Sequence, residues 1–565
     1  MENLLNIENL SVDFINEKQI TNALIDISLK VNKGEIVALV GESGSGKSVT
    51  ALSVLRLLPS AAKYISGKIY FNNENILSVR SKTIQNIRGN KIAMIFQEPM
   101  TSLNPVKSCG IQVSEAIKVH KKYNSFNAYK QTIELFKLVK LPNPKEIFHR
   151  FPFQLSGGQK QRVMIAMAMS CSPELLICDE PTTALDVTVQ KNILQLIQSL
   201  QQKTNMAVIF ITHDLGIVAE IADKVMVMYK GKIVEQGNTK EVLLNPQHLY
   251  TQALLACRPA NHRKGERLPV IADFLENNKS FHENKTMITE KENNPAANET
   301  KEIIVRIEDL KIWYPAIKTF TGKILQYNKA VNDVSLHVYK GETLGLVGES
   351  GCGKTTLGRA LLGLIPVTEG KIYFKNTDIT SLHPRALRHL KKDMQIIFQD
   401  PYSSLNPRKK IGHSIEEPLL VHKIFSSAKE RKSKVIELLE KVNLSADYYN
   451  RYPHQFSGGQ RQRIVIARAL ALQPSFIICD ESVSALDVSI QAQVLNLLND
   501  LKKEFDFTAI FISHDLSVVR YISDRIVVMN KGRIEESGNA EDIYNNPQKN
   551  YTKKLIASIP KTFVS

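Results

Sequence analysis

The sequence has no paired cysteines and no long hydrophobic run. Its six cysteines are scattered and none forms a CxxC pair, which argues against disulfides, a zinc site or an iron–sulfur cluster and favours a reducing cytosol. No run of 18 apolar residues occurs, so no membrane-spanning helix is predicted. The first residues, MENLLN, lack the basic and apolar regions of a signal peptide, and none is expected.

Length and composition favour a globular protein of several domains. At 565 residues, with 43% hydrophobic and 23% charged residues, the chain exceeds one ordinary core. The formal net charge of +17 suits nucleic acid, an anionic membrane face or a plain soluble surface. Charge alone does not choose among these three.

A glycine-rich loop is the most informative stretch of the chain. Residues 41–48 (GESGSGKS) fit the pattern GxxxxGK[ST], after an apolar run at 35–40 and before helical apolar spacing at 48–58. In such a loop the backbone N–H groups turn toward the β-phosphate, the lysine reaches the β/γ oxygens and the hydroxyl ligates Mg²⁺. A second loop, GESGCGKT, occupies 348–355. The candidate phosphate-binding residues are Gly41, Gly44, Gly46, Lys47, Ser48, Gly348, Gly351, Gly353, Lys354 and Thr355.

The two loops belong to a duplication with an offset of about 300 residues. A period of that size indicates a repeated domain rather than a solenoid. Between the halves the chain is polar, rich in Asn, Lys and Glu, and has little periodicity. We therefore predict a nucleotide-binding domain at 1–257, a flexible linker at 258–302 and a second such domain at 303–565.

Two acidic pairs follow apolar runs, at Asp179-Glu180 and Asp480-Glu481. Neighbouring residues on a strand point in opposite directions, so the first carboxylate can hold Mg²⁺ while the second polarises an attacking water. His213 and a matching histidine, His514, also follow apolar runs, at the strand end where α/β sheets bind ligands.

Three further pairs recur at matching places. Gln97 and Gln399 each end an apolar strand, where an amide reaches Mg²⁺ or its water. Phe14 and Tyr314 either stack on an adenine or pack in the core. The stretch Ser-Gly-Gly-Gln before a helical segment predicts an anion site at a helix N-terminus, with an ordinary helix cap as the alternative. Its residues are Ser156, Gly157, Gly158, Gln159, Ser457, Gly458, Gly459 and Gln460.

In this order the motifs resemble the nucleotide-binding domain of ATP-binding cassette (ABC) proteins, once in each half. The resemblance implies an α/β fold of two tandem P-loop NTPase domains, each with a mixed sheet core and a helical subdomain. It implies an ATPase that uses ATP and Mg²⁺ and whose halves pair head to tail, with ATP between the phosphate loop of one half and the Ser-Gly-Gly-Gln of the other. By this resemblance Glu180, Glu481, His213 and His514 are catalytic, and the metal-site residues are Ser48, Gln97, Asp179, Thr355, Gln399 and Asp480.

A narrower resemblance is carried by SLNP at 102–105 and 404–407, YPHQFSGGQRQR at 452–463, and the tails NPQHLYTQALL at 245–255 and NPQKNYTKKL at 546–555. These are similar to the ATPases of dipeptide, oligopeptide and nickel importers, and to fused double ATPases of microcin C-type and glutathione importers. The resemblance implies two integral-membrane permease partners, an extracytoplasmic binding protein, no nucleic acid, and a peripheral location at the cytoplasmic face of the cell membrane.

Two other functions compete with this one. A soluble tandem ATPase acting on ribosomes or nucleic acid also fits two cassettes without a membrane span, but its usual long charged helical linker is not seen at 258–302. A non-catalytic scaffold conflicts with two intact Asp-Glu pairs. The sequence does not identify the transported substrate, and the two loops differ chiefly at Ser45 versus Cys352.

Overall fold

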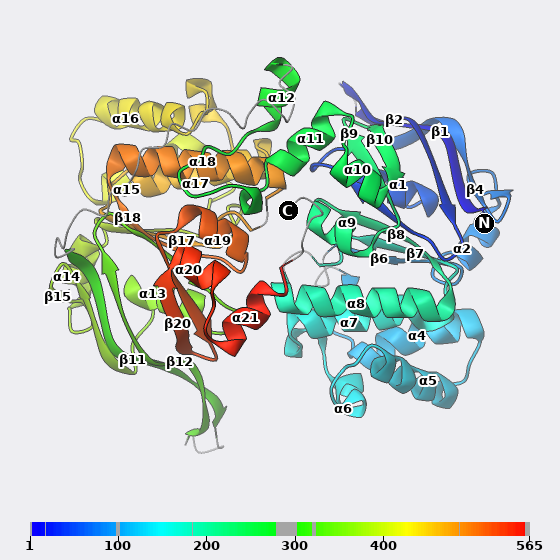
Figure 1. Ribbon diagram of the computed structural model, residues 1–565, viewed down its shortest axis with the longest axis horizontal. Helices are drawn as coiled ribbons and strands as arrows, with labels where there is room; N and C mark the ends of the chain where they lie inside the picture. The colour runs from blue at the N-terminus through cyan, green and yellow to red at the C-terminus, as the bar shows by residue number, and fades with distance from the viewer. Residues whose placement is uncertain are drawn as a thin grey trace. The chain divides into compact units, whose positions relative to one another are not determined.

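The computed structural model describes residues 3–16, 19–97, 102–182, 185–277, 302–318, 324–484 and 486–559. They form two compact units, which are coloured by residue number in Figure 1. The first takes in the described residues up to Leu255 together with α12 (Ile271–Asn277). The second takes in Ala256–Val270 together with the described residues from 302 to Ile559. The predicted boundaries of the domains stay a prediction.

The first unit contains two sheets, with strand orders β2-β1-β4-β5 and β10-β9-β3-β8-β7-β6. The first sheet is antiparallel, whereas in the second β3 runs parallel to β8 and β9. Every residue of β3, β7 and β8 is buried, which explains why these strands read as continuous apolar runs. The strands are β1 (Asn3–Asn16), β2 (Gln19–Asn32), β3 (Ile36–Val40), β4 (Ala62–Phe71), β5 (Glu74–Asn75), β6 (Ile92–Ile95), β7 (Leu175–Asp179), β8 (Ala207–Thr212), β9 (Lys224–Tyr229) and β10 (Lys232–Asn238).

Helices of the first half pack around the second sheet and form a helical subdomain from α4 to α7. Val113, Ile117 and Phe136 are fully buried in the core of that subdomain. Helix α8 buries Ile193, Ile197 and Leu200, the spacing of one helix face. The helices are α1 (Lys47–Val54), α2 (Ser81–Ile87), α4 (Cys109–Lys121), α5 (Ser125–Leu138), α6 (Pro144–His149), α7 (Gly157–Ala168), α8 (Val187–Thr204), α9 (Leu215–Ile221), α10 (Thr239–Leu244) and α11 (Leu249–Ala256).

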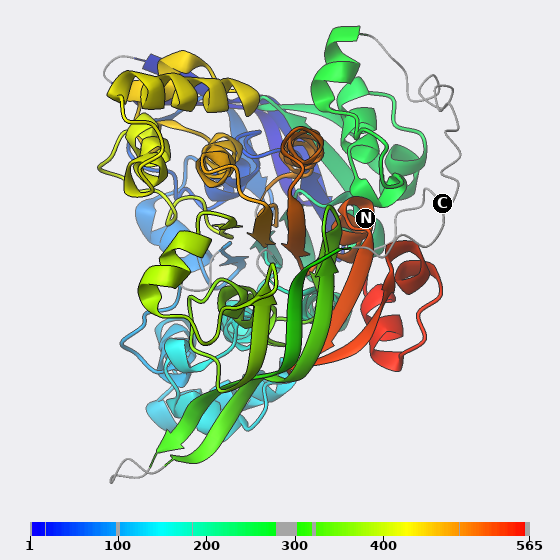
Figure 2. The same ribbon diagram turned by 90° about the vertical axis from the view of Figure 1, so that its left-hand side faces the viewer.

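The second unit repeats both sheets, as β12-β11-β14-β15 and β16-β17-β18-β13-β19-β20. Its strands are β11 (Ile303–Lys318), β12 (Ile324–Tyr339), β13 (Thr343–Val347), β14 (Glu369–Phe374), β15 (Thr377–Asp378), β16 (Met394–Ile397), β17 (Phe476–Asp480), β18 (Thr508–Ile512), β19 (Arg525–Asn530) and β20 (Arg533–Asn539). Its helices are α13 (Lys354–Leu361), α14 (Pro384–Leu390), α15 (Ile411–Val421), α16 (Ala428–Lys441), α17 (Gly458–Leu470), α18 (Val488–Phe505), α19 (Leu516–Ile522), α20 (Ala540–Asn545) and α21 (Asn550–Ile556). Figure 2 shows the long hairpin of β11 and β12 beside β14.

The expected α/β class, with a mixed sheet and a helical subdomain in each half, is confirmed. One predicted helix is shorter than its apolar spacing suggests. Helix α1 ends at Val54 rather than near residue 58, because Arg56 adopts a left-handed conformation with φ 49°, which ends a right-handed helix. No helix among the described residues has the length and apolarity needed to cross a bilayer.

The stretch Ala256–Val270, called the docked segment below, belongs to the second unit although it follows the first half of the sequence. The Asn496 side chain on α18 holds the backbone of Leu268 twice, accepting from its N–H at 3.0 Å and donating to its carbonyl at 2.8 Å. The Tyr521 hydroxyl on α19 donates to the Glu266 carbonyl at 2.7 Å. Most of this segment lies within the predicted flexible linker, and residues 278–301 of that linker lie outside the described residues.

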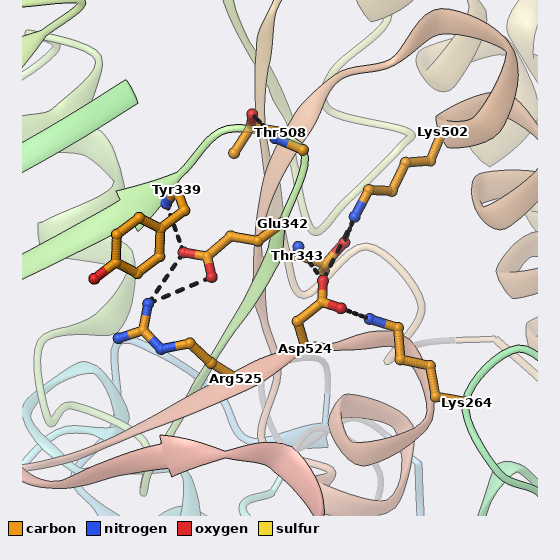
Figure 3. Close-up of polar contacts among 9 residues, drawn as sticks. Lys264, Tyr339, Glu342, Thr343, Lys502, Thr508, Asp524 and Arg525 are labelled. Carbon is orange, nitrogen blue, oxygen red and sulfur yellow. Dashed lines mark hydrogen bonds and ion pairs between the residues drawn. The ribbon is translucent and has the colours of Figure 1, made fainter. Parts of the chain in front are cut away.

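Figure 3 shows the ion pair that adds to this docking. Lys264 binds the Asp524 carboxylate, which also accepts from the Thr343 N–H at 2.7 Å and lies 3.7 Å from the Lys502 ammonium. Burial acts to raise the pKa of Asp524, but the charge of Lys264 and these hydrogen bonds hold it below its ordinary value. Asn496 is buried, whereas the Lys264–Asp524 ion pair is exposed. The hydrogen bonds between Asn496 and Leu268 therefore anchor the docked segment more strongly than the ion pair does.

Replacing Asn496 with Leu should release the docked segment. The change leaves the buried N–H and carbonyl of Leu268 without these partners, at a cost of about 1–3 kcal/mol for each group. We expect trypsin to cleave after Arg263, Lys264 or Arg267 at least about thirtyfold faster, in proportion to the opened population. Gln195→Leu is the matched control, since Gln195 is exposed at the equivalent place on α8. Unchanged cleavage in the Asn496 variant would contradict the anchoring role.

Candidate functional site

The phosphate loops lie between β3 and α1 and between β13 and α13. In the first loop the Lys47 ammonium donates to the carbonyls of Gly41 at 2.7 Å and Glu42 at 2.8 Å. In the second, Lys354 donates to Gly348 at 2.7 Å and to the next carbonyl at 3.0 Å. Both lysines are buried, so each loop wraps around one positive charge, an arrangement suited to phosphate.

Both loops begin at a glycine that no other residue can replace without strain. Gly41 has φ +150°, and a Cβ there would lie 2.2 Å from the Met228 carbonyl oxygen. Gly348 has φ +152°, and its Cβ would lie 2.2 Å from the Met529 carbonyl oxygen. The close approach to the end of β9 or β19 therefore fixes where each loop leaves its strand.

A hydroxyl and a carboxylate meet at the start of each helix. Ser48 donates to the Asp179 carboxylate at 3.1 Å, and Thr355 donates to Asp480 at 3.0 Å. Burial raises the pKa of Asp179 and of Asp480. These oxygen donors are the kind that Mg²⁺ prefers, and a cation there would offset the burial of the carboxylate. The residues present thus fit the predicted metal site.

The second carboxylate of each pair lies between an amide and an imidazole. Gln97 donates to Glu180 at 3.0 Å, and the His213 Nδ1 lies 3.4 Å from the other carboxylate oxygen. In the second half Gln399 donates to Glu481 at 2.7 Å, and the His514 Nδ1 lies 3.6 Å away. The structure thus brings together the side chains that the sequence places on three strand ends.

The two glutamates adopt a conformation that the sequence does not reveal. Strands β7 and β17 end at Asp179 and Asp480, and the following Glu180 and Glu481 have φ 46° and 48°. The expected simple alternation along a strand is therefore wrong at these residues. Left-handed backbone is costly for a residue with a Cβ, and here the glutamate N–H is paired with the Ile211 or Ile512 carbonyl at 3.0 or 2.9 Å. The backbone turn aims the carboxylate at the histidine and the glutamine.

In the second half, Glu481 and His514 each shift the pKa of the other toward the charged form. Burial acts to raise the pKa of Glu481, but the hydrogen bond and charge of His514 hold it below its ordinary value. Burial likewise acts to lower the pKa of His514, and Glu481 holds it above its ordinary value. The carboxylate is thus ionised at neutral pH, which is the form that accepts a proton from water.

The Ser-Gly-Gly-Gln residues form a helix cap in each half. Ser156 and Gln159 cap α7 reciprocally: the Gln159 side chain accepts from the Ser156 N–H at 3.1 Å, and the serine hydroxyl accepts from the Gln159 N–H at 3.4 Å. Ser457 and Gln460 cap α17 in the same way, at 3.1 and 3.4 Å. The capping alternative is therefore realised within each unit, and the head-to-tail role of these residues stays a prediction.

The two candidate adenine-stacking aromatics differ in exposure. Phe14 lies on β1 and is half-buried, whereas Tyr314 lies on β11 and is 42% exposed. The exposed ring of Tyr314 is open for stacking on a base. Cys352, the other point of asymmetry, is buried, and burial raises the pKa of its thiol, so the thiol is a poor nucleophile.

Sequence reasoning missed two residues that contact the phosphate loops. The hydroxyl of Tyr250 accepts from the Glu42 N–H at 3.0 Å, and the hydroxyl of Tyr551 accepts from the Glu349 N–H at 3.1 Å. Both tyrosines lie in the repeated tails, at the same spacing from one another as the two histidines of the site. That shared spacing was the available signal.

Comparison with known proteins identifies the family. The ABC transporter family model matches residues 24–183 and 331–484, and the model described as "Oligopeptide/dipeptide transporter, C-terminal region" matches 234–285 and 536–563. These matches cover both halves of the chain.

Curated relatives cover nearly the whole chain. The chain is 46% identical over 99% of its length to the glutathione import ATP-binding protein GsiA of Pectobacterium atrosepticum, of which it covers 89%. It is also 46% identical to the protein of the same name from Escherichia coli strain K12 and 47% identical to that from Shigella dysenteriae serotype 1. In both comparisons the match spans 99% of this chain and 90% of the relative. The resemblance drawn from the motifs is confirmed.

Proposed function

Because the chain belongs to the ABC transporter family, we propose that its two halves drive import of glutathione or other short peptides through separate membrane permeases. The observation that carries this proposal is the importer-type C-terminal region, which follows each ATPase cassette. The names of the full-length relatives support glutathione as a member of the substrate class. The chain itself is an ABC-type ATPase.

The geometry supports a role for each group at the nucleotide. Lys47 and Lys354 neutralise the β/γ-phosphate oxygens, and the paired hydroxyl and carboxylate of each half hold Mg²⁺, which neutralises phosphate charge when bound. Glu180 and Glu481 orient the attacking water and accept its proton. His213 and His514 orient the glutamate of their half and contact the γ-phosphate. Gln97 and Gln399, which donate a hydrogen bond to that glutamate, make its position depend on whether nucleotide is bound. Each Ser-Gly-Gly-Gln closes the site of the opposite half, where the free N–H groups of a helix N-terminus favour an anion.

The partners follow from this proposal. Two integral-membrane permeases receive the work of the ATPase, and an extracytoplasmic binding protein supplies the peptide. The chain then acts at the cytoplasmic face of the cell membrane, where its positive net charge is favourable. The alternative of a soluble ATPase acting on ribosomes or nucleic acid has no support among the named relatives.

The test is co-purification together with uptake. Tagged chain extracted from detergent-treated membranes of its own cells should retain two multi-span membrane proteins. Cells that lack the chain should lose uptake of labelled glutathione or short peptides, and the intact chain should restore it. Retention of ribosomes or nucleic acid instead of membrane proteins would contradict the proposal.

A further inference from the structure

We propose that Tyr250 and Tyr551 are positioning residues that hold the two phosphate loops in the shape that binds nucleotide. Tyr250 on α11 accepts the Glu42 N–H at 3.0 Å, and Tyr551 on α21 accepts the Glu349 N–H at 3.1 Å. The same contact occurs in both halves, which argues against an accident of packing. The inference rests on the proposed role of the loops in phosphate binding.

The hydroxyl and the loop lysine hold the same peptide unit from its two sides. The peptide between Gly41 and Glu42 gives its N–H to Tyr250, and its carbonyl accepts from the Lys47 ammonium at 2.7 Å. In the second half the corresponding carbonyl accepts from Lys354, also at 2.7 Å. Because a peptide unit is planar and rigid, two fixed ends set its orientation. The tyrosine therefore sets the place from which the lysine ammonium reaches the phosphates.

The start of the helix that carries each tyrosine is held by a glutamate on β10 or β20. Glu235 on β10 accepts the N–H groups of Gln247 and His248, at 2.7 and 3.2 Å, just before α11. Glu536 on β20 accepts the N–H groups of Gln548 and Lys549, at 2.8 and 3.2 Å, just before α21. The Tyr250 ring is also fully buried and packs on Tyr229, with ring centroids 4.3 Å apart. These contacts keep the hydroxyl from swinging away from the loop.

The tyrosines and the phosphate loops fall within matches to two different family models. The ABC transporter matches end at 183 and 484, whereas both tyrosines fall within the matches to the importer-type C-terminal region. This region therefore contributes to the nucleotide sites directly, by holding the phosphate loop of its own half. The geometry assigns it a part in ATP binding that the cassette alone does not supply.

The test replaces both tyrosines with phenylalanine in the full chain, which keeps the rings and removes only the hydroxyls. The KM for MgATP should rise about three- to tenfold, the range expected for one lost, partly buried hydrogen bond in each site, while kcat changes less than about twofold. The loop binds phosphate in both ground and transition states, so its loss appears in KM rather than kcat. In the nucleotide-free protein, amide exchange in the peptides that contain Glu42 and Glu349 should accelerate.

Tyr449→Phe is the matched control. Its hydroxyl is buried and donates to Glu416 at 3.3 Å, in the helical subdomain, and Phe148 stands at the equivalent position of the first half. The control removes a buried hydroxyl without touching either loop, so KM and exchange in both loops should match the parent. If the double variant fails to fold, the single Tyr250→Phe and Tyr551→Phe variants carry the same measurements.

Two results would overturn the inference: loop exchange equal to that of the parent, or an unchanged KM with only a lower thermal midpoint, which is the mark of a merely structural role. The exchange measurement needs no nucleotide. If the parent failed to bind MgATP, the proposed function would fall, while faster exchange in the phenylalanine variants would still support the anchoring of the loops.

Discussion

Exchanging Glu180 and Glu481 for Gln together should cut ATP turnover by about two to four orders of magnitude, the usual contribution of a positioned general base, and leave MgATP binding within about twofold. Glutamine keeps the shape of the side chain but does not take a proton from water. Neither glutamate belongs to a phosphate loop, and each accepts a hydrogen bond from Gln97 or Gln399. Steady-state phosphate release and equilibrium binding of a fluorescent ATP analogue measure the two effects separately.

Glu220→Gln is the control for this experiment, because it makes the same chemical change on the exposed side of α9 and should leave turnover unchanged. Each single glutamate variant keeps one intact site and should retain part of the activity if the two sites work independently. If the double variant hydrolysed ATP at the parental rate, neither glutamate would act as a general base.

The pair of changes Lys47→Met and Lys354→Met should weaken MgATP binding by about two to three orders of magnitude. Breaking a buried charge pair costs about 3–5 kcal/mol, and each 1.4 kcal/mol is a factor of ten in affinity. Methionine keeps an unbranched side chain of similar length, so the packing beside the loops survives. Titration with the fluorescent analogue in the presence of Mg²⁺ reports the loss.

Lys203→Met removes one positive charge from the exposed face of α8 and controls for a general effect of charge. Its affinity for MgATP should equal that of the parent. If the double lysine variant still bound MgATP with parental affinity, the loops would not be the phosphate sites.

Short local patterns predicted which side chains the structure brings together at each candidate site. The order of strand, glycine loop and helix is written in neighbouring residues, and the strand ends that carry Asp179, His213 and Gln97 are marked by buried apolar runs. Because the parallel strands β6, β7 and β8 are neighbours, their carboxyl ends meet at one edge and bring these residues together.

What the patterns did not predict depends on contacts between distant residues or on single backbone angles. The docked segment is held by Asn496, 228 positions away from Leu268, and it has no periodic pattern of its own. The left-handed turn at Glu180 leaves no trace in hydrophobic spacing. The sequence indicated only that Tyr250 belongs to a repeated tail. Its neighbouring residues carry no sign that its hydroxyl binds a loop 208 positions away.

The docked segment changes where the chain can be divided. A second half expressed from residue 303 would contain α18 and α19 but not Ala256–Val270, which belongs to the same compact unit. In such a fragment the side-chain amide of Asn496 would lack the backbone of Leu268, and the hydroxyl of Tyr521 would lack the carbonyl of Glu266. A fragment that begins at Ala256 keeps those partners. The compact unit of the second cassette therefore includes a segment that precedes it in the sequence, and the two halves are not interchangeable modules joined by an inert spacer.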